Sequence, residues 1–373
     1  RKGGSNSTLS GSVTHARASS ATMTNSSGTL VTVGNNVPRV GHHVYNGSAW
    51  VNEGVLHESE ARTNLVTYSN DFTDVSWTQN VTITPNDAVS PDGTSNASHL
   101  SFPSSGYLFI SSNSRTVGQK YTVSAWVKSY DGTDEAFQLY GENGAFKQNF
   151  IATSEWQRFS FTYTATTSTG SVGGIARPTT NIPASLHAYG IQIEAGATPS
   201  SYIPTSGSTV TRAAETLTVP AANLPYSSTN MSIQMSGKMT FADEDVSGQL
   251  KFFRWFKDNN NEIRVLYDTH SSYGTGRITF QQIQGGNFRI VNSGSNIYPA
   301  GLSVPFNIAS RHGSSFVNGS ISGTALTVIT TPVALPDLST STLSLGNTFM
   351  GTIAQFRMWD EDLTDTGIAE AST

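Results

Sequence analysis

The sequence predicts an all-β protein with two antiparallel β-sandwiches after a loop-rich N-terminal segment. Many short stretches alternate apolar and polar residues, which is the period-2 pattern of strands buried on one face. Turn residues separate these stretches, and no window of about eleven residues has the 3.6-residue period of an amphipathic helix. A chain of 373 residues exceeds one ordinary sandwich, so we expect at least two domains.

A strand near the middle of the chain is predicted to close the first sandwich. Tyr189, Ile191 and Ile193 occupy alternating positions, so we expect their side chains to point together into a core. Pro199 and Pro204 follow and interrupt strand pairing, because proline donates no ladder hydrogen bond. We therefore divide the chain into a packing segment over 1–63, a first sandwich over 64–212 and a second sandwich over 213–373.

Alternation and turns also predict the individual strands. In the first sandwich, Val123 and Ala125 point one way and Trp126 points the other. In the second, turns at 258–261 and 285–286 predict hairpins. The other predicted strands lie near 137–140, 159–163, 231–241, 250–256, 262–267, 278–283, 288–291, 306–309, 316–319, 343–346 and 350–359, with a short helical tail after them.

The composition excludes several classes of function. Charged residues make up 13% of the chain, about half the usual share of ~25%, so neutral Ser, Thr, Asn and Gly supply most of the polar surface. The net charge is −5 and no lysine–arginine cluster occurs, so nucleic-acid binding is not expected. No apolar run approaches ~18 residues, so no membrane insertion is expected. The absence of cysteine excludes disulfides and thiolate sites.

A series of motifs follows in order through the N-terminal segment. They lie at 17–22, 36–39, 54–58, 60–65 and 68–72, and Trp77 comes after them. This series resembles a leader that is common in bacteriophage tail-fibre and minor structural proteins. That leader usually has an acidic pair before Ala-Arg-Thr-Asn-Leu, whereas here Ser59 separates Glu58 from Glu60. The resemblance implies a virion protein located outside the cell.

The two predicted sandwiches resemble different lectin-type families. The first resembles the jelly-roll carbohydrate-binding modules, and the 187–214 stretch matches how phage copies of that module end. The second resembles the laminin-G/concanavalin A-like sandwich. Asn318 stands where that family usually has Asp before Gly319, which removes one carboxylate from any metal site. These resemblances imply a jelly roll followed by a concanavalin A-like domain.

Glycan binding requires flat aromatic rings and planar polar groups. In the first sandwich we expect such side chains on the face opposite the core, namely Trp126, Gln138, Tyr140, Arg158, Gln192 and Glu194. The alternative is that the N-terminal segment or a neighbouring subunit covers these rings. In the second sandwich Trp255 and Tyr267 are the candidates, with packing of Trp255 between the sheets as the alternative.

The sequence does not predict catalysis or a cofactor. A glycosidase needs two carboxylates facing each other roughly 5–10 Å apart, whereas the acids at 243–245 and 360–362 are chain neighbours that diverge. His187 and Tyr189 share a face, but that face is expected to be the core, so no lyase is predicted. No convergent set of histidines and carboxylates predicts a transition-metal site. The jelly-roll resemblance leaves Asp71 as the candidate ligand of a structural calcium ion.

We interpret the chain as a bacteriophage virion structural protein: a tail fibre, tail spike or minor tail protein that recognises host surface glycans. A loop-rich segment with Trp50 needs a partner, so we expect a homo-oligomer, a trimer by resemblance, in contact with other virion proteins. The alternatives are a capsid decoration or head-fibre protein, a glycan depolymerase or hydrolase, and a secreted bacterial adhesin.

Overall fold

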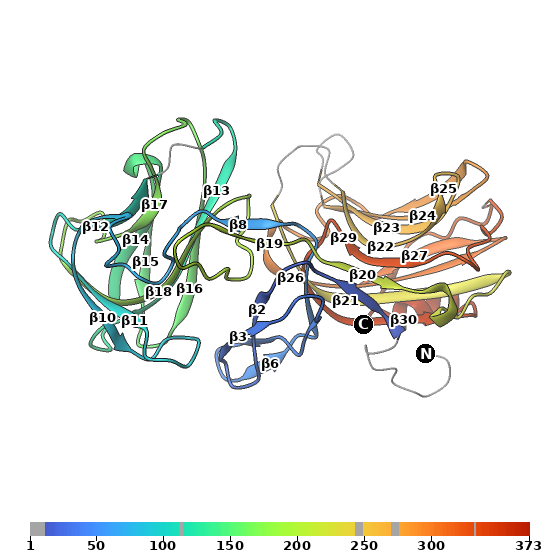
Figure 1. Ribbon diagram of the computed structural model, residues 1–373. Helices are drawn as coiled ribbons and strands as arrows, with labels where there is room; N and C mark the ends of the chain where they lie inside the picture. The colour runs from blue at the N-terminus through green and yellow to red at the C-terminus, as the bar shows by residue number, and fades with distance from the viewer. Residues whose placement is uncertain (1–11, 112–114, 243–248, 270–275, 332) are drawn as a thin grey trace. The chain divides into compact units, whose positions relative to one another are not determined.

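The computed structural model describes residues 12–111, 115–242, 249–269, 276–331 and 333–373 (Figure 1). The described chain is built from antiparallel strands, two 3-10 turns and the short helix α2, Thr364–Ala371. This confirms the predicted all-β class with two sandwiches. Among these residues no helix has the length and apolarity needed to cross a membrane.

The chain divides into two compact units that do not follow the predicted boundaries. Unit 1 contains residues 1–18, 35–60 and 214–373, and unit 2 contains 19–34 and 61–213. The N-terminal segment therefore does not stand alone, because each unit takes part of it. The short strands of the N-terminal segment explain the division. Some of them, such as β1 (Thr14–Ala16) and β7 (Val55–Glu58), join sheets whose other strands come from much later in the sequence, and the rest pair with the next strand in a local hairpin.

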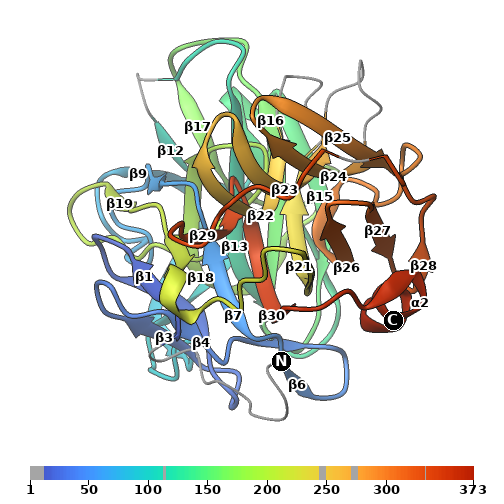
Figure 2. The same cartoon turned by 90° about the vertical axis from the view of Figure 1, so that its right-hand side faces the viewer.

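Unit 1 is a sandwich of two seven-stranded sheets. The first has the order β1 (Thr14–Ala16), β20 (Thr216–Val219), β29 (Leu343–Asn347), β22 (Gln249–Asp258), β23 (Asn261–Asp268), β24 (Arg277–Gln284) and β25 (Asn287–Asn292). The second has the order β28 (Thr324–Ala325), β27 (Val317–Ile321), β26 (Gly301–Gly313), β21 (Asn230–Phe241), β30 (Met350–Trp359), β7 (Val55–Glu58) and β4 (Arg39–Val40). The hairpin of β5 (His43–Tyr45) and β6 (Trp50–Asn52) and the turn η2 (Ala221–Asn223) complete the unit, and α2 lies beside β27 and β28 (Figure 2).

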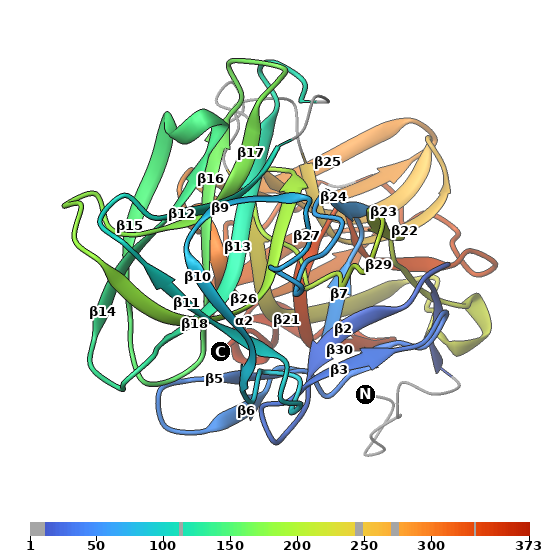
Figure 3. The same cartoon turned by 60° about the vertical axis from the view of Figure 1, so that its left-hand side comes forward.

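Unit 2 is a sandwich of two five-stranded sheets. One has the order β10 (Thr82–Ala88), β11 (Ala97–Phe102), β18 (Ala184–Ala195), β13 (Lys120–Ser129) and β16 (Gln157–Thr164). Figure 3 shows β10, β11 and β18 running next to one another. The other has the order β15 (Phe146–Ala152), β14 (Glu135–Gly141), β17 (Ser171–Ala176), β12 (Tyr107–Ser111) and β9 (Trp77–Asn80). Two hairpin-like pairs, β2 (Ala21–Thr24) with β3 (Leu30–Val33) and β8 (Arg62–Asn64) with β19 (Val210–Arg212), and the turn η1 (Glu142–Gly144) belong to the same unit.

A bulge in β18 reverses the predicted phase of that strand. Ser124 pairs with Gln192 but Trp126 pairs with Tyr189, so β18 uses one residue more than β13 over this interval. Gly190 takes a φ of +62°, which favours glycine, and a Cβ there would meet Tyr202 at 3.0 Å. The bulge puts Tyr189 on the outer face, while Ile191 lies in the core. The prediction that these two side chains point the same way is therefore wrong.

The N-terminal motifs supply charged residues to a buried network in unit 1. Glu215 is 2% exposed and accepts hydrogen bonds from Arg17 Nη1 at 2.6 Å and from Arg39 Nε and Nη2 at 3.1 and 2.9 Å. Arg39 Nη2 also donates to Glu58 Oε2 at 2.7 Å. His15, Arg39 and Arg17 together hold the pKa of Glu215 far below its usual value against the opposing effect of burial. The network ties residues close to the N-terminus to the start of the second predicted sandwich.

Candidate functional site

The face of unit 2 that carries Trp126 is covered at one end by the protein itself. Tyr189 and Tyr202 pack against Trp126, with ring centroids 6.0 and 5.4 Å away. Leu30 of β3 packs on the same aromatic cluster, and Thr22 of β2 donates a hydrogen bond to the Tyr202 carbonyl at 2.6 Å. At this end of the face, the N-terminal segment therefore covers the aromatic rings, as the alternative interpretation of the sequence stated.

Three other residues of the predicted glycan-binding face lie on the same sheet as Trp126, but their polar groups hold the segment 198–203 in place. The Arg158 guanidinium stacks over the Trp126 ring at 4.6 Å and donates to the Ser200 carbonyl at 2.7 Å. Glu194 is fully buried and accepts from the Ser200 backbone and hydroxyl at 2.9 and 2.7 Å. Gln192 is also fully buried and donates to Glu194 Oε1 at 2.8 Å. None of these polar groups is free to meet a glycan.

Gln138 and Tyr140 lie on the other sheet of unit 2, so the expected six-residue surface is split. Both are on β14, which pairs with β15 and β17 and not with β13. Gln138 is 4% exposed and donates to the Arg177 carbonyl at 2.6 Å. Burial raises the pKa of the Tyr140 phenol strongly, and its ring sits edge-on to Phe109 at 6.3 Å. Their placement in one surface with Trp126 is a wrong prediction.

The open end of the Trp126 face holds a different set of side chains, which we call the Tyr130 site: Tyr130, His99, His187, Asp87 and Ser185. The register aligns His99, His187 and Lys128 across β11, β18 and β13. Tyr130 follows β13 and is 48% exposed. Its ring lies parallel on His99, with centroids 3.8 Å apart and 16° between the planes, and 5.2 Å from the His187 ring. One ring face thus rests on His99 and the other is available to a ligand.

Polar groups surround this exposed ring. His187 Nε2 lies 2.8 Å from Asp87 Oδ2, and His99 Nε2 lies 2.8 Å from Ser185 Oγ. Burial lowers the pKa of His99, and the opposing effect of Asp87 is smaller, so the imidazole is neutral near pH 7. A neutral imidazole offers one donor and one acceptor nitrogen. The site therefore combines an aromatic ring, a carboxylate and hydroxyl- or imidazole-type groups.

The same face continues as a second aromatic position next to the Tyr130 site. Lys128 Nζ lies 5.3 Å from the centre of the Trp156 ring. Trp156 Nε1 donates to the Val89 carbonyl at 2.9 Å, which fixes the orientation of the indole. Trp156 is half-buried and Val89 is exposed. A ligand longer than one sugar ring could reach both aromatic positions.

The sequence contains one signal for the Tyr130 site beyond the six residues predicted. Trp126, Lys128 and Tyr130 have the same parity, with Tyr130 directly after the end of β13, so alternation extends the Trp126 face to Tyr130. His187 was expected in the core, and the bulge at Gly190 places it on the outer face instead. Asp87 comes from β10, and only the long-range pairing of β10, β11 and β18 brings it here.

The second-sandwich candidates are core residues. Trp255 and Tyr267 are both fully buried in the hydrophobic core of unit 1. Trp255 Nε1 donates to the Ser341 carbonyl at 2.9 Å, and Tyr267 donates its hydroxyl to the Tyr298 carbonyl at 2.6 Å. Packing between the sheets is therefore the role of Trp255, and neither ring can contact a glycan.

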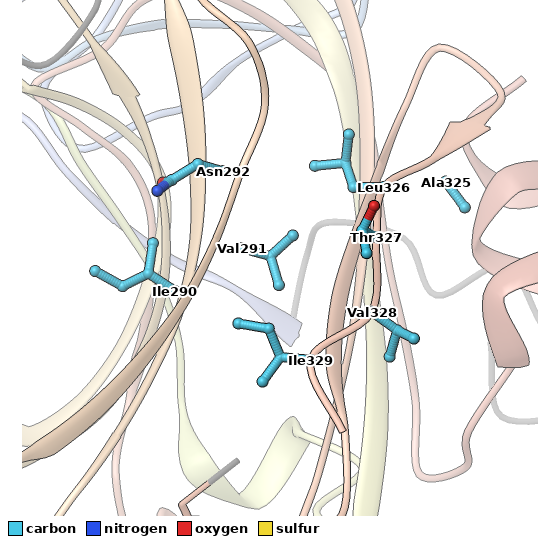
Figure 4. Close-up of a pocket in the computed structure, with 8 residues that line it drawn as sticks. All are labelled: Ile290, Val291, Asn292, Ala325, Leu326, Thr327, Val328 and Ile329. Atoms are coloured by element: carbon cyan, nitrogen blue, oxygen red, sulfur yellow. The ribbon is translucent and has the colours of Figure 1, made fainter. Parts of the chain in front are cut away.

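Unit 1 also has an open groove beside β25, shown in Figure 4. Aliphatic side chains dominate it, and Asn292 and Thr327 are its polar side chains; the complete lining is Ile290, Val291, Asn292, Ala325, Leu326, Thr327, Val328 and Ile329. The lining contains no titratable side chain. The groove offers shape and apolar contact but no group suited to proton transfer.

Metal sites and catalytic acid pairs need carboxylate or imidazole side chains that converge. Within the described ranges no group of three or more His, Asp or Glu side chains converges as metal ligands do. Asp71, the calcium candidate, is exposed, and its Oδ1 accepts from the Thr73 backbone and hydroxyl, as in an ordinary Asx turn. Asp362 pairs with Arg311 at 2.7 Å, and the acids at 243–245 lie outside the described residues.

No family model matches the sequence, and no curated protein matches it. Solved structures match at low similarity. The binding domain of botulinum neurotoxin DC, in complex with rat synaptotagmin II, is 12% identical with a TM-score of 0.32, and the match covers 42% of this chain and 39% of that chain. Domain 4 of AbnA, a GH43 extracellular arabinanase from Geobacillus stearothermophilus, in complex with arabinotriose, is 13% identical with a TM-score of 0.33 over 48% of this chain and 82% of that chain. The CBM22-1–CBM22-2 tandem domain of Paenibacillus barcinonensis Xyn10C is 11% identical with a TM-score of 0.29 over 81% and 98%.

Proposed function

We propose that this protein is a glycan-recognising protein that binds carbohydrate at the Tyr130 site of unit 2. The observation that carries this proposal is the ring of Tyr130, which is 48% exposed yet held parallel on His99 at 3.8 Å. A fixed, exposed aromatic face suits the apolar side of a pyranose ring. Asp87, Ser185 and the imidazoles supply the polar groups that hydroxyls require.

Binding, and not hydrolysis, is the activity that this arrangement supports. A glycosidase needs an acid and a second carboxylate facing the scissile bond. Of the five residues of the Tyr130 site one is a carboxylate, Asp87, and that group is engaged with His187 at 2.8 Å. Glu135 lies at the Ser185 backbone and is not one of the five. The Ser185–His99 hydrogen bond has the length found between a nucleophile and its base. No described carboxylate bonds to the second nitrogen of His99 to orient it as a base, so we do not assign hydrolysis.

A glycan array comparing the wild type with Tyr130→Ala tests the proposal. Removing the ring should weaken binding at least about tenfold, which corresponds to ~1.4 kcal/mol. The melting temperature should change little because the ring is half exposed. Tyr107→Ala is the matched control, since Tyr107 is 37% exposed on the other sheet of the same unit. Loss of binding in Tyr107→Ala but not in Tyr130→Ala would move the site to the other sheet and refute this assignment.

We further propose that the protein is a component of a bacteriophage virion, most simply a tail fibre, tail spike or minor tail protein acting in host adhesion. The ordered motif series of the N-terminal segment supports this role. An exposed apolar hairpin supports the proposed homo-oligomer: Tyr45 and Trp50 are 51% and 41% exposed, with ring centroids 5.4 Å apart.

Labelling and light scattering test the virion role and the oligomer separately. An antibody against the protein should mark the tail of the particle in electron micrographs, whereas a capsid signal would favour a decoration or head-fibre protein. Light scattering should give a trimer that Tyr45→Ser/Trp50→Ser converts to smaller species. A wild-type monomer at micromolar concentration would contradict the oligomer.

A further inference from the structure

The outer face of the first sheet of unit 1 carries a concentration of positive charge, which we call the basic patch: Lys251, Arg254 and Arg264. Arg254 and Arg264 lie directly opposite each other on β22 and β23, and Lys251 lies farther along β22 on the same face. Phe253, Trp255 and Val265 flank the two arginines and point into the core, which fixes the direction of the guanidinium groups. Leu250 and Phe252 flank Lys251 and are also core residues, and a register shift between 251 and 253 keeps Lys251 on the face of the arginines.

Among the residues that the structure describes, one carboxylate pairs with these cations. Glu262, which is 2% exposed, accepts from Arg254 Nε at 2.6 Å and pairs with Arg264 Nη1 at 2.9 Å. Arg264 Nε donates to Gln281 Oε1 at 2.6 Å. Lys251 makes no ion pair with any described residue. Among the described residues, the three cations of the patch therefore exceed the carboxylates paired with them by two, on a protein whose net charge is −5.

The cations of the basic patch repel one another, and a bound anion would reduce that repulsion. Burial lowers the pKa of Lys251, and the charges of Arg254 and Arg264 lower it further, against a smaller opposite effect of Glu262. Burial also lowers the pKa of Arg264; the charge of Glu262 opposes this shift, and the smaller effect of Arg254 adds to it. A bound oxyanion would offset the repulsion among these cations, and guanidinium groups match the geometry of a carboxylate.

Aromatic surface borders the patch. The Arg254 guanidinium lies over the Phe256 ring at 3.8 Å, which holds its planar fork in place. The register aligns Phe256, Glu262, Ile283 and Phe288 across four strands. Phe288 is 56% exposed. Flat apolar surface beside cations fits a sugar ring that carries a negative group.

We propose that the basic patch binds the carboxylate of an acidic oligosaccharide, such as one containing uronic acid. Nucleic acid is the weaker candidate, because a phosphate backbone calls for a row of cations and not a patch with two uncompensated charges. This site lies in unit 1 and does not depend on the Tyr130 site.

Isothermal titration of the full chain with tri-galacturonic acid tests the proposal, with the fully methyl-esterified oligomer as the neutral control ligand. The acid should bind and the ester should not, and raising the salt from 0.02 to about 0.5 M should weaken binding because charges near the surface are screened. Tyr130→Ala should leave this binding unchanged, so a failure here is distinguishable from a failure of the Tyr130 site.

Two substitutions move the affinity in opposite directions. Lys251→Gln should weaken binding at least about threefold, since Lys251 has no ion pair whose loss would disturb the fold. Glu262→Gln removes the internal carboxylate that competes for the arginines and should strengthen binding by a similar factor. Arg289→Gln is the matched control: Arg289 pairs in register with Gln282 and so lies on the opposite side of the sheet from Gln281.

Several results would overturn the proposal. These are equal binding of the acid and its ester, unchanged affinity in both Lys251→Gln and Glu262→Gln, and tighter binding of a single-stranded DNA 12-mer than of the uronate at about 0.15 M salt. Binding of inorganic sulfate that matches the uronate in affinity would also overturn it, because the saccharide would then contribute nothing.

Discussion

Replacing Glu215 by Gln is expected to destabilise unit 1 strongly. Glu215 is the shared acceptor of Arg17 and Arg39, which are 1% and 0% exposed, and it also accepts from the Glu58 backbone at 2.8 Å. Gln keeps the shape and one acceptor oxygen but removes the charge. Both buried guanidinium groups would then lose the charge of a shared acceptor, although Arg39 keeps its bond to Glu58. Leaving a buried charge uncompensated costs about 3–5 kcal/mol, a large part of the ~5–15 kcal/mol that keeps a domain folded.

Hydrogen exchange of the β21 and β26 amides in increasing urea measures the unfolding of unit 1 apart from unit 2. Asp337→Asn is the matched control, because Asp337 pairs with Lys257 at 3.6 Å in solvent and its loss should change the stability little. The pKa of Glu215 is lowered on folding, so its contribution is present above the unfolded pKa of about 4.3 and is lost as pH falls below it. A cost below about 1 kcal/mol for Glu215→Gln at pH 7 would refute this reasoning.

Two further predictions concern pH and packing. Burial lowers the pKa of His57 to about 4 and of His312 to about 3, so below about pH 6.5 the unfolded chain takes up protons before the folded chain does. The free energy of unfolding should therefore fall below that pH by about 1.4 kcal/mol per pH unit for each histidine, until the folded pKa of that histidine is reached. Denaturation of His312→Gln at several pH values should show a shallower fall, and a slope equal to that of the wild type would contradict the prediction. Trp126→Ala should lower the stability of unit 2 by about 2–4 kcal/mol, because the substitution empties the space beside Tyr189 and Tyr202. Glycan binding at the Tyr130 site should persist in the folded fraction. A melting temperature equal to that of the wild type would show that the Trp126 ring is not packed.

The sequence predicted the strands well where burial alone decides their phase. Val123 and Ala125 point into the core of unit 2 while Trp126 does not, as the alternation indicated. The turn at 258–261 and the hairpin at 285–286 also exist, because turn residues act locally. These features depend on a few neighbouring residues and so can be read from a single sequence.

Features that depend on long-range pairing could not be predicted. The phase of Tyr189 follows from a bulge opposite β13, and nothing local to Gly190 distinguishes a bulge from an ordinary strand glycine. Gln138 has the expected parity, but its strand joins the sheet of β15 and β17, so parity alone misplaced it. His99 and Asp87 reach the Tyr130 site only through the order of β10, β11 and β18.

The interleaved path of the chain has a consequence for dissecting this protein. Unit 1 needs β1, β4 and β7 from the first sixty residues as well as everything after residue 213. A ribosome must therefore synthesise residues 215–219 before the two arginines can meet Glu215 and β1 can pair with β20, and β30 before β7 can dock. Expression of 214–373 alone would expose the bare edge of β30 where β7 belongs, and such an edge invites pairing with another molecule. A fragment meant to isolate this sandwich should splice 12–18 and 35–60 to the later segment, not simply cut the chain at its middle.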